Sequence, residues 1–132
     1  MLAGPKCRLM PQWLMPVSRS ILVVEDEPLI AMMLEDFLET LGHTVHASCE
    51  SVGDAVAQAE KGGFDVAILD VSLNGETVWP VAHKLREKKI PFVLATGGHV
   101  EPPPPEFRHV PLIEKPYTVD RVTPALEAAL SA

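Results

Sequence analysis

Few cysteines, few aromatic residues and no excess of positive charge distinguish this sequence of 132 residues. The two cysteines, Cys7 and Cys49, lie in segments of different character, and their spacing suggests neither a disulfide framework nor a metal knuckle. We therefore expect ordinary thiols and a cytoplasmic location. No apolar run approaches the roughly 20 residues that span a bilayer, so we also expect no membrane partner.

The charge balance is acidic, with 18 Asp and Glu residues against 11 Lys and Arg residues and a formal net charge of −7. A nucleic-acid-binding surface needs a basic patch for its phosphate contacts, and the sequence offers none. We therefore expect no nucleic-acid partner. The length suits one domain whose core needs no disulfide or metal to fold.

The first 19 residues differ in character from the rest of the chain. Pro5, Pro11 and Pro16 interrupt any apolar core that a signal peptide would need. We predict a loosely ordered extension over residues 1–19 and one folded domain over residues 20–132.

An apolar run that ends in a polar side chain occurs four times along that domain. Residues 66–69 read as a strand that is buried on both faces, and Asp70 stands where the strand ends. The other three runs end in the same way: residues 21–24 before Glu25 and Asp26, residues 92–95 before Thr96, and residues 110–113 before Glu114 and Lys115. A fifth, shorter strand with alternating polarity is predicted over residues 44–48.

Helical patterns lie between most of these strands. Apolar spacing predicts a first helix over residues 29–41, Ser51 with Asp54 predicts the start of a second, and a third begins near Thr77. A last helix begins at Thr118 or Asp120 and contains Pro124, so it either starts properly at residues 123–124 or kinks there.

The place of a fourth helix is taken by a run of prolines at residues 102–105, and consecutive prolines cannot lie inside a helix. We predict an extended segment with at most one helical turn over residues 106–108. The fourth helix is thus shortened or lost.

Alternating strands and helices predict a parallel sheet with right-handed crossovers. The economical α/β arrangement is a flavodoxin-like, doubly wound, five-stranded sheet of order 2-1-3-4-5, in which strands one and three are neighbours. Glu25 and Asp26 then share a crevice with Asp70.

Three carboxylates in one crevice repel one another, so either their pKa values rise or a cation lies between them. Oxygen ligands without nearby Cys or His favour Mg²⁺. A carboxylate can also act as a nucleophile and form an aspartyl phosphate. Lys115 supplies a point charge for phosphoryl oxygens, and the hydroxyl of Thr96 supplies a hydrogen bond.

Other interpretations of these residues exist. An acid or Thr after a strand commonly caps a helix, and a Lys before Pro is commonly a surface residue. A phosphatase of the haloacid-dehalogenase type combines similar residues, but its nucleophile lies in Asp-x-Asp after the first strand, which Glu25-Asp26-Glu27 does not match. A third alternative is a binding module that works without phosphorylation.

As a set, the motifs at the strand ends resemble the four signatures of the receiver domain of two-component response regulators. They are Val23-Val24-Glu25-Asp26-Glu27-Pro28, Ile68-Leu69-Asp70, Ala95-Thr96-Gly97 and Glu114-Lys115-Pro116-Tyr117, in the order and at the intervals of that family over about residues 20–131. The resemblance implies that Asp70 accepts a phosphoryl group from a sensor histidine kinase or a phosphotransfer protein.

The resemblance also implies a role for each site residue. Asp26 and Asp70 ligate Mg²⁺, Glu25 acts largely through water, and the backbone carbonyl of Ser72 completes the protein ligands. Thr96 and Lys115 bind the phosphoryl oxygens. A cis peptide is expected before Pro116.

The sequence departs from the common receiver pattern at three places. Glu25 replaces the more frequent Asp, and Leu112 occupies the position of an aromatic switch residue. Residues 94–99 are similar to a stand-alone subfamily with a Phe-Ala-Thr-Gly signature. We therefore expect a receiver without an output domain, which signals to an unidentified downstream protein through the fourth-helix region, strand five and the last helix.

Overall fold

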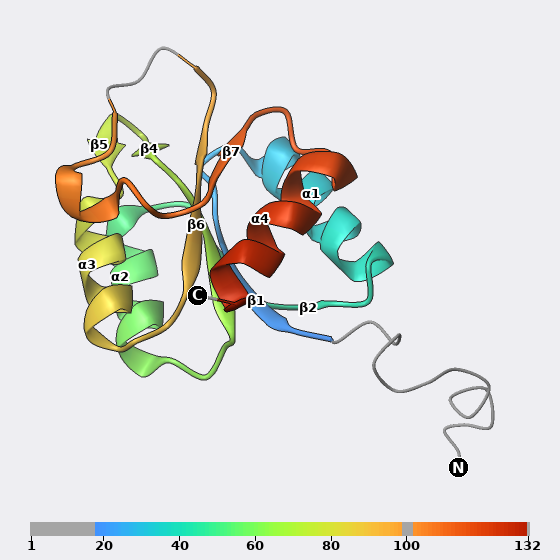
Figure 1. Cartoon of the computed structure of the whole chain (residues 1–132), viewed down its shortest axis with the longest axis horizontal. Coiled ribbons are helices and arrows are strands. Elements are labelled where there is room, and N and C mark those ends of the chain that lie inside the picture. Colours follow the sequence, from blue (N-terminus) through green and yellow to red (C-terminus); the bar gives the residue numbers. More distant parts are fainter. Residues whose placement is uncertain (1–17, 99–101, 132) are drawn as a thin grey trace.

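The computed structural model describes residues 18–98 and 102–131 as an α/β domain (Figure 1). Most of the predicted extension, residues 1–17, therefore lies outside the described residues. The strands are β1 (Ser20–Val24), β2 (Thr44–Cys49), β3 (Val66–Asp70), β4 (Ser72–Leu73), β5 (Glu76–Thr77), β6 (Phe92–Thr96) and β7 (Leu112–Glu114). The helices are α1 (Pro28–Thr40), α2 (Val52–Lys61), α3 (Trp79–Glu87), α4 (Val119–Ser131) and the 3-10 helix η3 (Pro105–Phe107).

Five parallel strands form the main sheet in the order β2-β1-β3-β6-β7, which confirms the predicted order 2-1-3-4-5. β1 and β3 are buried along nearly their whole length because helices cover both faces of the sheet. Side chains of β1 alternate between the two cores: Leu22 and Val24 contact the core beneath α2 and α3, whereas Ile21 and Val23 contact the core beneath α1 and α4.

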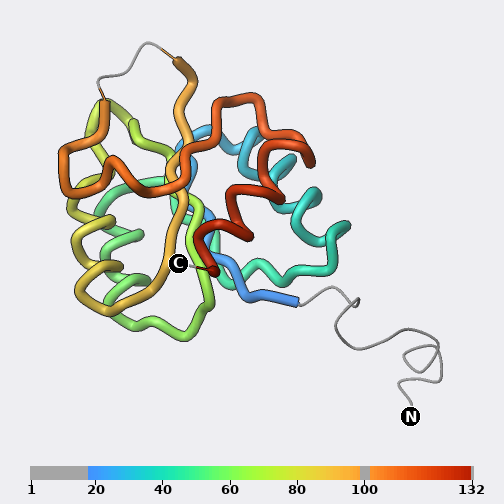
Figure 2. The backbone as a smooth tube through the Cα atoms, in the orientation of Figure 1, coloured from blue at the N-terminus to red at the C-terminus, as the bar shows by residue number. Residues whose placement is uncertain are grey.

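The crossover from β6 to β7 differs from the other crossovers, as predicted. Between β6 and β7, the described residues contain no α-helix and only the 3-10 helix η3, which lies beside α3 (Figure 2). Phe107 of η3 is 1% exposed and packs against the rings of Trp79, His83 and Phe92, at centroid distances of 5.7, 4.9 and 5.8 Å. One aromatic side chain thus fills the space beneath this crossover.

Two local predictions need correction. Strand five begins at Leu112 and not at residue 110. After β3 the chain forms a short antiparallel hairpin, in which Ser72 of β4 pairs with Thr77 of β5 and Leu73 pairs with Glu76. α4 begins at Val119 and continues through Pro124, so a start at residues 123–124 is wrong.

Some apolar residues of the first helix, α1, are exposed to solvent. Leu29 is 79% exposed and Met33 is also exposed, while Leu34 and Leu38 are fully buried. The buried stripe of α1 is narrower than the apolar stripe of the sequence, because only one side of the helix contacts the sheet.

Candidate functional site

The ends of four strands bring the predicted site residues to one edge of the sheet. Val24 pairs with Leu69, so the residues that follow β1 lie beside Asp70 at the end of β3. Asp70 pairs in turn with Ala95 of β6, and Thr96 pairs with Glu114 of β7, directly before Lys115. Parallel strands end at the same edge, which is where ligands bind in open α/β sheets.

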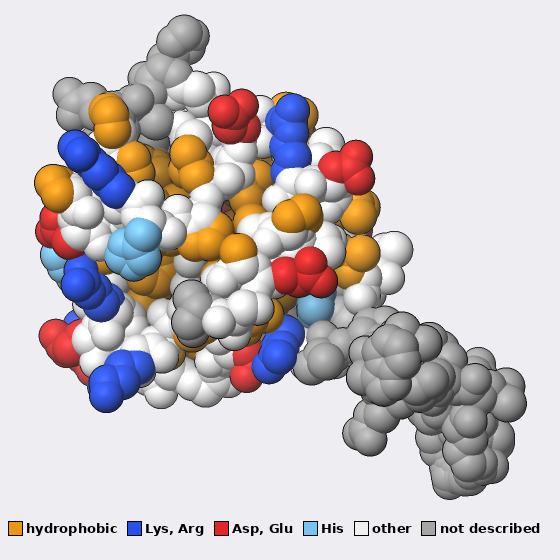
Figure 3. All heavy atoms as spheres, viewed as in Figure 1, with side chains coloured by type: hydrophobic (Ala, Val, Ile, Leu, Met, Phe, Trp, Pro, Cys, Tyr) orange, Lys and Arg blue, Asp and Glu red, His pale blue; other side chains and the backbone are white. Residues whose placement is uncertain are grey.

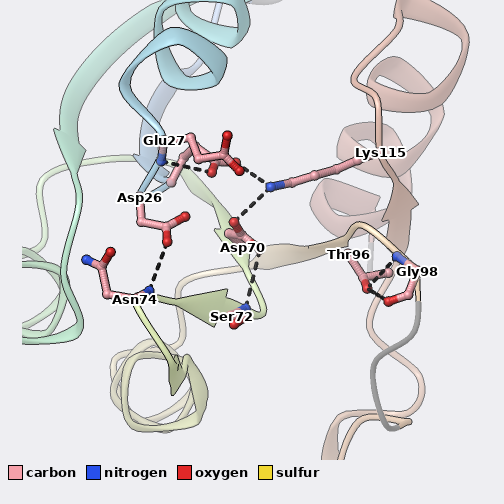
Figure 4. A network of polar contacts seen from close by, with 9 residues as sticks. Asp26, Glu27, Asp70, Ser72, Asn74, Thr96, Gly98 and Lys115 are labelled. Carbon is pink, nitrogen blue, oxygen red and sulfur yellow. Dashed lines mark hydrogen bonds and ion pairs between the residues drawn. The ribbon is translucent and has the colours of Figure 1, made fainter.

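Lys115 lies at the centre of this site and bridges the carboxylates of Glu25 and Asp70 (Figure 4). Its Nζ atom donates to Oε1 of Glu25 at 2.6 Å and to Oδ2 of Asp70 at 2.8 Å. Glu25 is fully buried and Asp70 is 6% exposed. A buried carboxylate is costly unless it is paired, so the ammonium group of Lys115 stabilises both acids in the described state.

The protonation equilibria of Glu25 and Lys115 reflect this close packing. Burial raises the pKa of Glu25 to about 7, and the negative charge of Asp70 adds to the rise, while the Lys115 hydrogen bond opposes it. Burial works to lower the pKa of Lys115, but its hydrogen bonds to Asp70 and Glu25 outweigh that effect and raise it. Lys115 is therefore a permanent cation at neutral pH.

The acidic side chains fit a divalent cation. Glu25, Asp26 and Asp70 each present one carboxylate oxygen, and these three oxygens all lie within 4.8 Å of one another. Oxygen-only ligands with several acidic charges favour a hard cation such as Mg²⁺. The donor set thus agrees with the predicted cofactor.

Backbone amides hold these carboxylates in place. The amide of Ser72 donates to Oδ1 of Asp70 at 3.3 Å, and the amide of Asn74 donates to Oδ2 of Asp26 at 2.9 Å. The predicted ligand role of the Ser72 carbonyl stays a prediction.

Asn74 is a residue of this site that the sequence patterns do not indicate. Its backbone has a φ of 50°, and its side-chain amide donates to the carbonyl of Glu50 at 3.1 Å. The Asn-Gly pair at residues 74–75 signalled a turn, but nothing in the sequence indicated that this turn contacts Asp26.

Thr96 lies at the same edge with its hydroxyl turned away from Asp70 (Figure 4). Its Oγ1 atom accepts a hydrogen bond from the amide of Gly98 at 3.3 Å and donates to the carbonyl of Gly98 at 3.4 Å. The structure thus brings together Glu25, Asp26, Asp70 and Lys115, while Thr96 is close in the fold but bonded elsewhere.

Two further predictions concern the chain around Lys115. The peptide bond between Lys115 and Pro116 is cis, which confirms the expected isomer. Leu112, at the position of the aromatic switch residue, is 48% exposed.

Fold and site together define a class of protein. The chain belongs to the response regulator receiver domain family, whose pattern matches residues 21–106. This membership favours a receiver over a phosphatase of the haloacid-dehalogenase type.

Individual relatives include proteins of known structure. SdrG from Sphingomonas melonis Fr1, solved in solution, is 50% identical with a TM-score of 0.77, over 90% of this chain and 100% of SdrG. The BeF3-activated conformation of SdrG from Pseudomonas melonis Fr1 is 51% identical with a TM-score of 0.71, over 84% of this chain and 95% of SdrG.

Similar curated proteins are longer than this chain. The phyllosphere-induced regulator PhyR of Methylorubrum extorquens is 30% identical over 122 residues, which are 86% of this chain and 44% of PhyR. The transcriptional regulatory protein TcrA of Mycobacterium tuberculosis is 40% identical over 82 residues, 58% of this chain and 31% of TcrA. The chain spans half or less of the length of the curated relatives it matches.

Within the described parts of the chain, none of the helices has the length and apolar character needed to cross a membrane.

Proposed function

We propose that this chain is a phosphorylation-controlled receiver that accepts a phosphoryl group on Asp70 from a sensor histidine kinase or a phosphotransfer protein. The observation that supports this most is the contact of Lys115 with Asp70 inside a cluster of acids that fits Mg²⁺. A surface carboxylate without a catalytic role does not need such an arrangement.

In the proposed transfer, a carboxylate oxygen of Asp70 attacks the phosphorus of a phosphohistidine. The new O–P bond forms as the N–P bond breaks, and the released imidazole nitrogen retains the electron pair of that bond. Charge neutralisation and in-line positioning are the main requirements of such a reaction. Glu25 and Asp26, with Asp70 and the Ser72 carbonyl, would hold Mg²⁺, which neutralises negative charge on the phosphoryl oxygens.

Lys115 and Thr96 are the proposed contacts to the phosphoryl group. Lys115 already bonds Asp70, so its ammonium group needs only a small movement to reach a phosphoryl oxygen. The hydroxyl of Thr96 has to leave Gly98 first. Loading of Asp70 would therefore change the backbone after β6, and ordering or release of a loop by phosphate contacts is a known way to switch a protein surface.

We further propose that the chain acts as a stand-alone receiver. The proposal is supported by its similarity to SdrG, which extends over the whole SdrG chain. Its downstream signal would pass to a protein partner through η3, β7 and α4. Leu112 and Val119 give this surface exposed apolar side chains, which suit a protein interface.

Beryllofluoride with Mg²⁺ tests the proposal, because the adduct it forms on an aspartate imitates an aspartyl phosphate. We expect backbone NMR resonances around Asp70 and Thr96 to shift in the wild type and to stay unchanged in Asp70→Asn. Asp36→Asn removes an exposed acid of α1 and should respond as the wild type does. A wild type that does not respond would favour a binding module that works without phosphorylation.

The donor is tested separately by incubation with purified phosphorylated histidine kinases or phosphotransfer proteins. We expect label to move from the donor to the wild type and not to Asp70→Asn. Transfer to Asp70→Asn at the wild-type rate would contradict the assignment of Asp70.

A further inference from the structure

The hydroxyl group of Tyr117 lies buried near the acidic site without a partner. Tyr117 is 4% exposed, and its hydroxyl oxygen has no hydrogen-bond partner among the described residues. Buried hydroxyl groups are normally hydrogen-bonded, because an unpaired one loses its bonds to water without compensation. A Phe at this position would avoid that loss. We therefore expect the hydroxyl to have a hydrogen-bond partner in another state of the protein.

The surroundings of Tyr117 indicate which partner that is. The Nζ atom of Lys115 lies 5.7 Å from the centre of the Tyr117 ring. Burial raises the pKa of the Tyr117 phenol, and the negative charges of Glu25 and Asp70 and the closeness of the hydroxyl to the Glu25 carboxylate raise it further. The hydroxyl thus lies near Glu25 without forming a hydrogen bond of good geometry. The phenol therefore stays protonated and can donate a hydrogen bond.

In the described state, both carboxylate oxygens of Glu25 already accept hydrogen bonds from other donors. Its Oε1 atom accepts from Lys115 at 2.6 Å, and its Oε2 atom accepts from the amide of Glu27 at 3.2 Å. Under the function proposed above, Lys115 moves to a phosphoryl oxygen when Asp70 is loaded. The buried Oε1 atom of Glu25 then loses its strongest donor.

We propose that Tyr117 is a positioning residue whose hydroxyl donates to Glu25 once Lys115 has moved to the phosphoryl group. The bond satisfies two buried groups together and keeps the Glu25 carboxylate directed toward the metal. This inference rests on the proposed function and assigns a role to a hydroxyl that the transfer itself does not use.

Because the chain has a single tyrosine, one isotope label reports on this hydroxyl alone. We would label the ring carbon that bears the hydroxyl with ¹³C and record its NMR resonance before and after addition of Mg²⁺ and beryllofluoride. We expect the resonance to shift in the wild type and to remain in place in Asp70→Asn. An unchanged Tyr117 resonance, in a wild type whose Asp70 backbone does shift, would overturn this inference and leave the proposed function intact.

Tyr117→Phe tests the energetic consequence by removing only the hydroxyl. We expect its affinity for beryllofluoride in the presence of Mg²⁺ to fall by about tenfold, the factor that one hydrogen bond to a charged group supplies. Thr123→Val is the matched control, because the Thr123 hydroxyl is also buried without a partner among the described residues but lies on α4.

The two variants separate a role in the loaded state from a role in folding. We expect both to be at least as stable as the wild type without ligand, and only Tyr117→Phe to bind the adduct weakly. Wild-type affinity in Tyr117→Phe, or an equal loss in Thr123→Val, would contradict the proposal.

Discussion

The Nζ atom of Lys115 lies 2.6 Å from Oε1 of Glu25, although 90 residues separate the two in the chain. This contact joins the end of β7 to the end of β1 across the carboxyl edge of the sheet. Glu25 is fully buried, so this contact affects the stability of the protein as well as the chemistry of the site.

Removal of Lys115 is expected to destabilise the unloaded protein. Lys115→Met leaves Glu25 and Asp70 buried without their cation, and loss of one partner of a buried ion pair costs about 3–5 kcal/mol. The free energy of unfolding in urea measures the loss, and added Mg²⁺ should reverse part of it. Lys61→Met removes an exposed cation of α2 and should cost much less; equal losses would contradict the prediction.

Glu25 is expected to make stability depend on pH in the acidic range. Its pKa is 4.5 for an unperturbed side chain and about 7 in the folded protein, so the folded state binds its proton more tightly. The resulting stabilisation is fully present below pH 4.5 and is lost as the pH rises through about 7.

The variant Glu25→Gln has no titratable group at this position, so it does not show this pH dependence. The difference in unfolding free energy between Glu25→Gln and the wild type, measured without metal, should therefore move in favour of the variant as the pH rises. Glu39→Gln changes an exposed acid of α1 and serves as the control. A difference that stays constant from pH 4.5 to 7 would show that burial does not dominate at Glu25.

The backbone of Asn74 is expected to limit what this position tolerates. Because φ is 50°, Asn74→Ala keeps a Cβ atom in the left-handed region and should be about 1–2 kcal/mol less stable than Asn74→Gly, which has none. Both variants lose the side-chain bond to Glu50, so their difference in unfolding free energy isolates the backbone effect. Equal stability of the two would refute the prediction.

Phe107 is expected to be the main anchor of the crossover between β6 and β7. Truncation of a buried Phe to Ala costs about 3–5 kcal/mol, and Phe107→Ala should also alter the fluorescence of Trp79, whose ring stacks on it. Phe37→Ala, at a partly buried position of α1, should cost less and leave Trp79 unchanged. A larger loss in Phe37→Ala would point to a different anchor.

Sequence patterns could predict the strand order, because alternating strands and helices favour a doubly wound parallel sheet. They could also predict the meeting of four side chains, because the buried strands end in polar residues at one edge of that sheet. The contacts of Thr96 and Asn74 could not be predicted. The orientation of the Thr96 hydroxyl depends on the Gly98 backbone, and Asn74 reaches Asp26 across 48 residues through a short hairpin. The exposure of Leu29 likewise depends on how α1 lies on the sheet, which apolar spacing does not determine.

The anchoring of η3 by Phe107 also bears on how readily the crossover can be remodelled. Where an α-helix forms the crossover, moving the crossover requires either that several helical turns unfold or that the whole helix shifts as a rigid body. Within the described residues, this segment is fixed by a few side chains. The Phe107 ring packs against Trp79, His83 and Phe92, and Glu106 contacts His83 and Arg86. The length and composition of the crossover segment can therefore change at a small cost in stability, provided that an aromatic side chain remains at the position of Phe107.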